Sequence, residues 1–277
     1  MIPFRKMNGL GNDFVVVDAR RQRLDFKQNE IRALANRETG IGFDQFIIIA
    51  PPEHNGDALM RIFNADGGEV EACGNAARCV AAVLLDESGR GETTIESAGG
   101  LMTARPAGPG RTAIDMGLPR FDGASIPLSA DAGNPQRLMI EGFADRYGPA
   151  ACVNVGNPHA VFFVADVGSI PLREDGPILE THPLFPERAN ITFAEALDRE
   201  HVVARVWERG VGPTRACGTA ACAVAALSAK LGLTGTAVEV MLPGGPLLID
   251  VTSGRILMEG PYALDYEGTL PEPERAR

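Results

Sequence analysis

The chain of 277 residues is 45% hydrophobic and 22% charged, which is typical of a globular protein with one large domain or two of ordinary size. The net charge of −10 and the lack of a basic stripe interleaved with aromatic residues argue against a nucleic-acid partner. No apolar run approaches the roughly 20 residues of a membrane span, so we expect no membrane association.

The first half of the chain combines short apolar runs with two segments of helical spacing. Strands are predicted at residues 13–18, 46–50, 58–63, 93–96 and 112–116. The helices are predicted at 29–36 and, after a Gly-rich turn at 64–68, from Cys73 to about Leu85.

The second half repeats this order. Strands are predicted at residues 160–165, 202–207 and 238–242, with a turn at 210–212 before an alanine-rich helix from Cys217 to about Lys230. Because both alanine-rich helices carry little charge, each must be buried on most of its circumference.

An internal repeat relates the two halves. Residues 61–85 reappear as residues 205–229 with ten identities in 25 aligned positions, and the offset is constant, since 217 − 73 = 144 for the two cysteines. So long a period indicates two duplicated domains rather than a solenoid. We therefore predict an α+β (α/β) fold of two pseudo-symmetric domains, each a curved, mostly antiparallel β-sheet or barrel wrapped around a central helix.

The domain boundary is predicted near the Gly-Leu-Pro at 117–119. The N-terminal lobe then comprises residues 1–117, to which residues 263–277 return, and carries Cys73. The C-terminal lobe comprises residues 118–262 and carries Cys217. The tail after Leu270 is expected to be a frayed end.

The two repeated Cys-Gly pairs are the candidate chemical groups. Each thiol stands at a helix N-terminus, where unpaired N–H groups and the helix dipole favour a thiolate, so we expect lowered thiol pKa values. The same helix ends suit a bound carboxylate. The N–H groups that would hold it belong to Gly74, Asn75, Gly218 and Thr219.

Two thiols on either side of a carboxylate-bearing carbon suit proton exchange at an amino-acid α-carbon. One thiolate removes the proton, and the opposite thiol returns a proton to the other face, which inverts the configuration. Because the helix ends stabilise the negative charge, no cofactor is expected, and the sequence shows no marked cofactor-binding motif.

The remaining repeat and cysteine residues are interpreted as structural. Cys79, Cys152 and Cys222 have no symmetric counterpart and are predicted to be packing residues. Their spacings to the paired cysteines do not match metal ligands, so no metal site is expected. An odd total of five cysteines also argues against a disulfide framework and favours a reducing compartment. Arg61 and Arg205 are the repeat's charged pair and are read as structural.

No apolar segment of the kind found in secretory signals follows Met1, and together with the odd cysteine count this predicts a cytoplasmic protein.

Six sequence strings resemble those of diaminopimelate epimerases and cover nearly the whole chain in the family's order. They are GLGNDF (9–14), GFDQ (42–45), FNADGGEVEACGNAARC (63–79), GNPHAV (156–161), ERANITF (187–193) and ERGVGPTRACGTAACA (208–223). The resemblance implies a cofactor-independent isomerase that interconverts LL- and meso-diaminopimelate for lysine and peptidoglycan synthesis. It also implies two α/β domains that close over the substrate, and commonly a homodimer.

The resemblance also implies roles for individual residues. Cys73 and Cys217 would be the catalytic acid and base, and His159 and Glu208 would tune their pKa values, with Glu208 also meeting the reacting ammonium. Gly74, Asn75, Gly218 and Thr219 would hold the carboxylate of the reacting centre. Further substrate contacts, several of them to the distal amino-carboxylate end, are implied for Asn12, Gln45, Asn64, Asn157, Asn190 and Arg209.

Three other functions fit parts of the sequence. A proline racemase-like or hydroxyproline epimerase also uses two cysteines, but it needs an apolar slot where Asn64, Asn190 and Arg209 stand. A thiol hydrolase built on Cys217, His159 and an asparagine leaves the second cysteine unexplained. A non-enzymatic scaffold with a Cys73–Cys217 redox clasp would show ligand turnover that is insensitive to reductant.

Overall fold

A computed structural model describes residues 1–70 and 73–273 of the chain. Ala72, one of the identical positions of the repeat, and residues 274–277 of the predicted frayed tail lie outside the described residues. The chain divides into two compact units, of which unit 1 is Met1–Ile114 with Glu259–Arg277 and unit 2 is Asp115–Met258.

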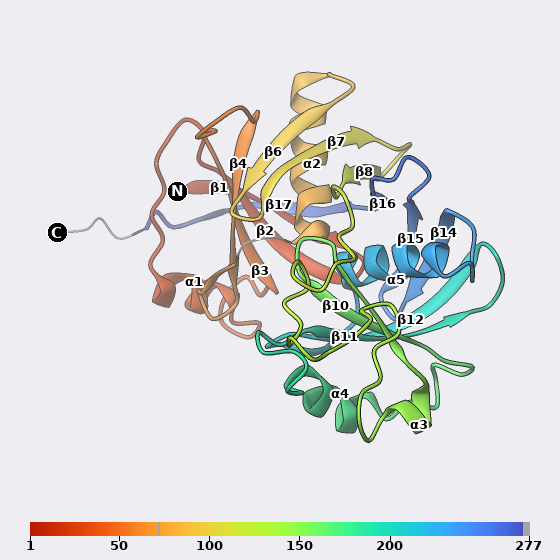
Figure 1. The fold of residues 1–277 in the computed structure, drawn as a ribbon. Coiled ribbons are helices and arrows are strands. Elements are labelled where there is room, and N and C mark those ends of the chain that lie inside the picture. The colour runs from red at the N-terminus through yellow and green to blue at the C-terminus, as the bar shows by residue number, and fades with distance from the viewer. Residues whose placement is uncertain (71–72, 274–277) are drawn as a thin grey trace. The chain divides into compact units, whose positions relative to one another are not determined.

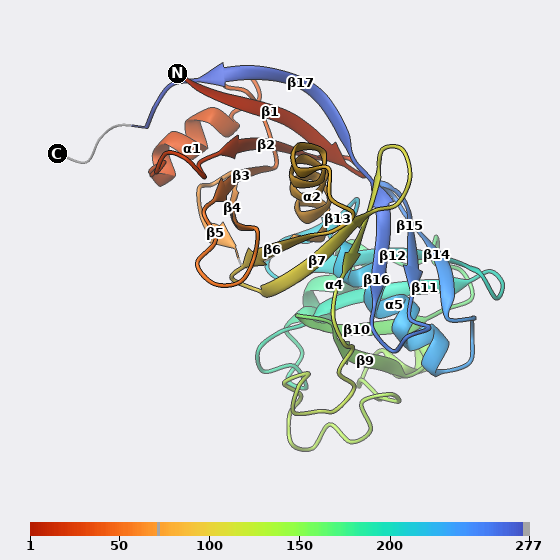
Figure 2. The same cartoon turned by 90° about the horizontal axis from the view of Figure 1, so that it is seen from above.

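Unit 1 is a strongly curved sheet that surrounds one helix. Figure 2 looks almost along that helix, α2, and shows strands on several sides of it. Its strands are β1 (Ile2–Gly9), β2 (Asn12–Asp18), β3 (Gln45–Ala50), β4 (Ala58–Asn64), β5 (Glu69–Val70), β6 (Thr93–Ser97), β7 (Gly100–Pro106), β8 (Arg111–Asp115) and β17 (Ala263–Leu270). Its helices are α1 (Gln28–Ala35) and α2 (Gly74–Ser88).

The strand pairing of unit 1 is mixed. β1 pairs antiparallel with both β2 and β17, β2 runs parallel to β3, and β3 pairs antiparallel with β4. β4 then runs parallel to β6, which forms a hairpin with β7. The parallel steps require crossovers, and these are supplied by α1 between β2 and β3 and by α2 between β4 and β6.

The sequence of α2 explains its central position. Alanine and valine at its buried positions keep the helix narrow, so strands approach it closely, and residues from Gly74 to Leu85 are buried. The helix ends at Gly89, whose φ of 63° is the left-handed conformation that glycine adopts without steric cost.

Unit 2 repeats the same architecture around α5 (Figure 1). Its strands are β9 (Ala150–Asn154), β10 (Pro158–Phe163), β11 (Asn190–Ala196), β12 (His201–Glu208), β13 (Gly212–Thr214), β14 (Ala237–Leu242) and β15 (Gly245–Asp250). Strand β16 (Leu257–Pro261) carries the chain back from unit 2 to unit 1. Its helices are α3 (Ala144–Tyr147), α4 (Leu172–Glu180) and α5 (Gly218–Lys230).

The pairing of unit 2 matches that of unit 1 strand for strand. β9 and β10 are antiparallel, β10 and β11 parallel, β11 and β12 antiparallel, β12 and β14 parallel, and β14 and β15 antiparallel. In this order α4 corresponds to α1 and α5 to α2. The two pseudo-symmetric sheets around central helices confirm the predicted fold class.

Each unit has its own apolar core. In unit 2 the rings of Phe162 and Phe193 stack with centroids 5.0 Å apart, and Tyr147 meets Phe193 edge-on. In unit 1 Phe43 and Phe46 pack with Ile31 of α1 in a cluster between that helix and the sheet. Each such ring contributes roughly 2–3 kcal/mol through burial.

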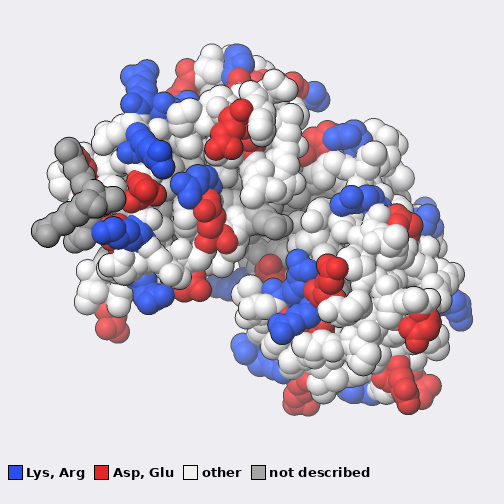
Figure 3. Space-filling model, turned by 60° about the vertical axis from the view of Figure 1, so that its left-hand side comes forward, with Lys and Arg blue, Asp and Glu red and all other residues white. Residues whose placement is uncertain are grey.

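The surface is consistent with the charge argument from the sequence. On the face shown in Figure 3, acidic and basic side chains are interspersed and form no continuous basic stripe. Among the described helices, none combines the length and the apolar character needed to cross a membrane.

Candidate functional site

Cys73 and Cys217 occupy the same position in their units, the residue immediately before a buried helix. Both have an extended backbone, with φ and ψ of −149° and 112° at Cys73 and −133° and 108° at Cys217. The predicted helix starts are therefore confirmed. Cys73 is half-buried and Cys217 is 6% exposed. All five cysteines lie among the described residues, and none of them forms a disulfide there.

In unit 1 the first turn of α2 is joined to β2 by side-chain amides. The Asn75 amide donates to Asn12 Oδ1 at 2.7 Å, and its own oxygen accepts from the guanidinium of Arg78 at 2.9 Å. Arg78 is fully buried and also donates to the Pro261 carbonyl. The amide that follows Cys73-Gly74 is therefore held in one orientation by a buried cation.

A second pair of amides lies at the ends of β3 and β4. Gln45 Nε2 donates to Asn64 Oδ1 at 3.0 Å, and these residues are register partners. Gln45 Oε1 is buried and has no hydrogen-bond partner among the described residues, so it can accept from a bound group. Asp44, the residue directly before Gln45, accepts from Asn12 Nδ2 at 3.3 Å and so connects the second pair to the first.

In unit 2 the Cys217 thiol lies beside the Glu208 carboxylate. Glu208 accepts hydrogen bonds from the Thr214 hydroxyl and from the thiol, and Cys217 Sγ lies 3.4 Å from Thr219 Oγ1. Burial raises the pKa of Glu208, and both hydrogen bonds act against this rise. Thr219 therefore contacts the thiol as well as standing in the first turn of α5.

The expectation of a lowered thiol pKa is wrong for Cys217. Burial raises its pKa well above the ordinary value, and the negative charge of Glu208 raises it further. The Thr219 hydroxyl and the Ala220 N–H lower it, as the helix start predicts, but their effect is the smaller one. The sequence revealed the helix terminus, but it could not show how completely the sulfur is buried.

His159 and Asn157 form a pair at the start of β10. His159 Nε2 and Asn157 Oδ1 lie 2.8 Å apart, so the ring nitrogen donates and the amide oxygen accepts. The ring is fully buried, which lowers its pKa to about 3, and the charge of Arg209 contributes to this shift. The imidazole is therefore neutral, and its Nδ1 has no partner among the described residues.

Asn190 connects the strand ends of unit 2. Its amide donates to the Pro158 carbonyl at 2.9 Å and accepts from the Arg209 N–H at 3.0 Å. The exposed Arg209 guanidinium donates to the Glu187 carbonyl at 3.2 Å. Asn190 thus fixes the position of Arg209 relative to β10.

The predicted site residues of the two units occupy matching places. Gln45 is the first residue of β3 and pairs with Asn64, the last residue of β4. Asn190 is likewise the first residue of β11, and Glu208 is the last of the neighbouring strand β12, next to the Ile191–Trp207 pair. The other matched pairs are Asn12 with Asn157, Cys73 with Cys217, Gly74 with Gly218, and Asn75 with Thr219. His159 and Arg209 have no polar counterpart in unit 1. The register partner of Asn190 in β10 is His159, whereas that of Gln45 in β2 is Phe14. Arg209 follows Glu208, whereas Ala65 follows Asn64.

The residues interpreted as structural have structural contacts. Cys79, Cys152 and Cys222 are fully buried, and burial raises the pKa of Cys79 and of Cys152 to about 12. Arg61 forms a two-point ion pair with Glu69, and Arg205 donates to three carbonyls of the 167–170 loop. Over the described part of the chain, no group of three or more His, Cys, Asp or Glu is placed to hold a metal ion.

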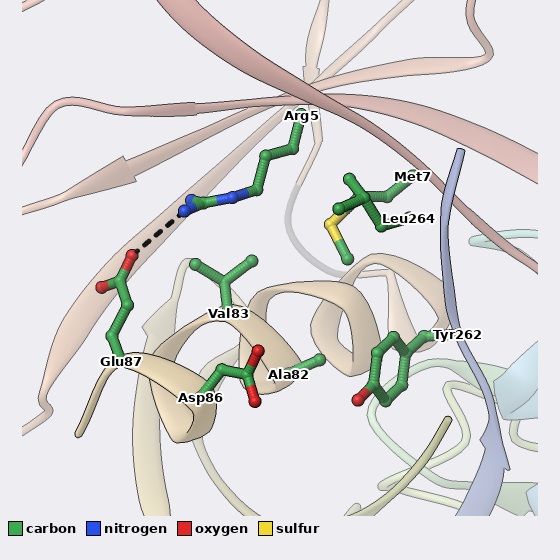
Figure 4. Close-up of a pocket in the computed structure, with 8 residues that line it drawn as sticks. All are labelled: Arg5, Met7, Ala82, Val83, Asp86, Glu87, Tyr262 and Leu264. Carbon is green, nitrogen blue, oxygen red and sulfur yellow. Dashed lines mark hydrogen bonds and ion pairs between the residues drawn. The ribbon is translucent and has the colours of Figure 1, made fainter. Parts of the chain in front are cut away.

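A groove on unit 1 is separate from these residues (Figure 4). It lies between α2 and the strands β1 and β17, and Arg5 spans it to Glu87 at 3.5 Å. Its lining includes Val83, Tyr262 and Leu264 but none of the predicted site residues.

The residues that hold the site and were missed from the sequence include Thr214 and Asp44. Both stand inside the strings that carry the family resemblance, GVGPTRACG and GFDQ. A threonine in a Gly-rich turn and an aspartate before a strand also occur as ordinary turn formers, so only the observed hydrogen bonds distinguish them.

The contrast between the two thiols can be tested by alkylation. At pH 8 we expect iodoacetamide to label Cys73 before Cys217, because Cys217 is buried and its pKa is raised. Glu208→Gln removes the neighbouring negative charge and should raise the labelling rate of Cys217 severalfold. Peptide mass spectrometry measures both rates, and the exposed Glu200→Gln is the control. Equal Cys217 rates in the two variants would contradict this account of its pKa.

Comparison with solved structures defines the class of fold. A predicted epimerase from Pseudomonas aeruginosa superimposes with a TM-score of 0.70 at 20% identity, covering 98% of this chain and 99% of that one. A probable proline racemase from Agrobacterium radiobacter gives a TM-score of 0.66 at 16% identity, with 98% and 93% covered. The chain therefore has the two-unit fold that these proteins share.

Sequence comparison identifies the family within this fold. The family model for diaminopimelate epimerase matches residues 4–121 and 151–264. The diaminopimelate epimerase of Rhodospirillum centenum is 48% identical over 271 residues, which cover 97% of this chain and 92% of that protein. The chain belongs to the diaminopimelate epimerase family, which is a family of isomerases, and the resemblance drawn from the six strings is confirmed.

Proposed function

We propose that this protein interconverts LL- and meso-diaminopimelate by proton transfer at the α-carbon, with Cys73 and Cys217 as the thiolate and thiol pair. The observation that carries the proposal is the repetition of one constellation in both units: a cysteine before a buried helix, and polar side chains at the matching strand ends. A reaction with one base on each face of a carbon uses such a duplication directly.

The carboxylate of the reacting centre would be held by the two helix starts. The N–H groups of Gly74, Asn75, Gly218 and Thr219 lie in the first turns of α2 and α5, where helix N–H groups lack intrahelical acceptors. Negative charge that develops when the α-proton leaves would be stabilised there, and no cofactor is required. We also propose the lobe bounds expected from the sequence, with residues 1–117 and 263–277 in the N-terminal lobe and residues 118–262 in the C-terminal lobe.

The two thiols would begin the reaction in different protonation states. The raised pKa of Cys217 favours its thiol form, which is ready to donate a proton, while Glu208 accepts its hydrogen bond. His159 would tune the pKa of Cys73 as a neutral imidazole, which offers Nδ1 as a hydrogen-bond acceptor and brings no positive charge. As Cys217 becomes a thiolate, Glu208 can pair with the substrate ammonium, which offsets the two adjacent negative charges.

The distal amino-carboxylate end would be read by the remaining polar groups. Arg209 can pair with the distal carboxylate, and the amides of Asn64, Asn157 and Asn190 can bind carboxylate or ammonium. Asn12 and Gln45 would face the substrate as well, and the unpartnered Gln45 Oε1 supports this role. These groups favour an extended substrate with an amino-carboxylate at each end over a proline-like ring. The thiol hydrolase alternative needs one nucleophile and leaves the second cysteine unexplained.

We further propose that the protein is a cytoplasmic homodimer that serves lysine and peptidoglycan precursor synthesis. The apolar side chains of Leu264 and Tyr266 are about half exposed on β17 and supply surface that a second copy could cover. Sedimentation velocity of the intact chain tests the dimer.

The reaction is tested by hydrogen exchange during turnover. The reduced protein is incubated with LL-diaminopimelate in deuterated water, and deuterium content and stereoisomer ratio are followed. We expect α-deuterium to accumulate together with the meso isomer, thiol oxidation to stop both, and reductant to restore them. Substrate that stays unlabelled and unepimerised would refute the proposal, and labelling of L-proline or trans-4-hydroxy-L-proline instead would favour the racemase alternative.

A further inference from the structure

One side chain of α4 holds the backbone on both sides of Glu208 and Arg209. The carboxylate of Glu180 accepts from Trp207 Nε1 at 2.7 Å through Oε2, and from the Gly210 N–H at 2.8 Å through Oε1. Trp207 directly precedes Glu208, and Gly210 directly follows Arg209. The anchor therefore brackets the two residues that the proposed function places against the substrate.

The Glu180 carboxylate is buried and therefore depends on these hydrogen bonds in place of water. Its side chain is 7% exposed, and the Arg188 guanidinium lies near it, with Nη1 at 3.5 Å from Oε1. A buried carboxylate requires hydrogen bonds to replace water, and bonds to an ionised acceptor are the stronger kind. The contacts to Trp207 and Gly210 are therefore restraints on the chain rather than incidental contacts.

The Trp207 indole is fixed from a second direction. Gly176, one turn earlier on α4, lies against the ring so closely that an added Cβ would stand 2.6 Å from indole atom Cδ2. The helix thus sets the plane of the ring while Glu180 sets the direction of its N–H. From the other side, Asn190 holds the Arg209 N–H at 3.0 Å.

We infer that Glu180 is a positioning residue for the reaction, acting through the Trp207–Gly210 segment and not through substrate. The inference rests on the proposed function, because it is that function that gives Glu208 and Arg209 their roles. Glu208 must meet the Cys217 thiol and Arg209 must meet the distal carboxylate, so a displaced segment would impair both proton transfer and binding.

Glu180→Gln tests this with little change in size. The amide retains one acceptor, so one of the two N–H donors must face an NH₂ group. We expect kcat/KM for LL-diaminopimelate to fall roughly 10- to 100-fold, with lower kcat and higher KM. The fluorescence of Trp207, the chain's single tryptophan, should shift, and amide exchange across residues 208–212 should accelerate.

Asp175→Asn is a matched control on the same helix. Asp175 is as buried as Glu180. It accepts from Arg146 at 3.2 Å and from the Tyr147 hydroxyl, and not from the Trp207–Gly210 segment. We expect this variant to lose thermal stability while keeping kcat and KM within twofold of the wild type. Equal losses of turnover in both variants would show that general destabilisation is the cause and would overturn the inference.

The remaining outcomes are also decisive. Turnover within twofold of the wild type in Glu180→Gln would overturn the inference, even if the fluorescence shifts. Should that variant fail to fold, Trp207→Phe removes one of the two bonds, and unchanged kinetics there would overturn it. If the wild type does not epimerise at all, the proposed function fails, and the anchor is judged by exchange at 208–212, where unchanged protection in Glu180→Gln overturns it.

Discussion

The Cys217→Ala variant is expected to convert LL-diaminopimelate to the meso isomer at least a thousandfold more slowly than the wild type. A positioned acid or base contributes roughly 10²- to 10⁴-fold, and no other thiol of unit 2 stands at a helix start. Cys73→Ala should show the same loss, because inversion needs a group on each face. Chiral chromatography of the reaction mixture measures the rate.

Cys222→Ala is the control for both cysteine variants. Cys222 is a fully buried thiol on the same helix, α5, and no role is proposed for it. We expect the control to lose some stability through the small cavity but to keep its turnover near that of the wild type. If Cys217→Ala were no slower than Cys222→Ala, the two-thiol mechanism would be rejected.

The second large effect is a loss of stability in weak acid that depends on His159. The pKa of the buried imidazole is about 3 in the folded protein, against about 6.5 in the unfolded chain. Between these values the unfolded state binds a proton that the folded state does not, so stability is full above pH 6.5 and falls as the pH decreases. The free energy of unfolding should drop by about 1.4 kcal/mol per pH unit, or about 2 kcal/mol from pH 7 to pH 5.

Urea denaturation followed by Trp207 fluorescence measures this effect, since the single tryptophan lies in the same unit as His159. Glu208 has the opposite effect, because its raised pKa stabilises the folded state in acid. The quantity to compare is therefore the difference in free energy of unfolding between the wild type and His159→Gln at each pH. His201→Gln, at an exposed histidine whose pKa is raised by Asp198, should keep the acid loss. If the free energy of unfolding fell equally with pH in the wild type and in His159→Gln, the acid loss could not be attributed to His159.

Much of the fold follows from the sequence because the two halves repeat it. The predicted strands at 13–18, 46–50 and 58–63 are β2, β3 and β4 to within a residue, and the helix starts after Cys73 and Cys217 are correct. The spacing of apolar residues predicts these strands, and the alanine-rich segments predict the two helices. Helix α4 was missed, because Gly176 and Pro177 in its middle are residues that normally end helices.

The site was predictable as a set of residues but not as a set of contacts. The strings gave Asn190 and Glu208, yet nothing in them shows that Asn190 connects β10 to Arg209 or that Glu208 accepts from Thr214. Glu180 lies outside every string, on a helix that was not predicted. Such contacts depend on strand register and helix packing, which form across long sequence separations.

Asn64 and Glu208 stand at the same place in two copies of one fold, and this has an evolutionary consequence. A symmetric ancestor assembled from two identical chains would have offered identical surroundings to both sulfurs. In a single chain, one copy can carry a neutral amide at this position while the other carries an anion. Divergence at one pair of matched positions could thus make the two sulfurs chemically unlike without altering the scaffold that holds them.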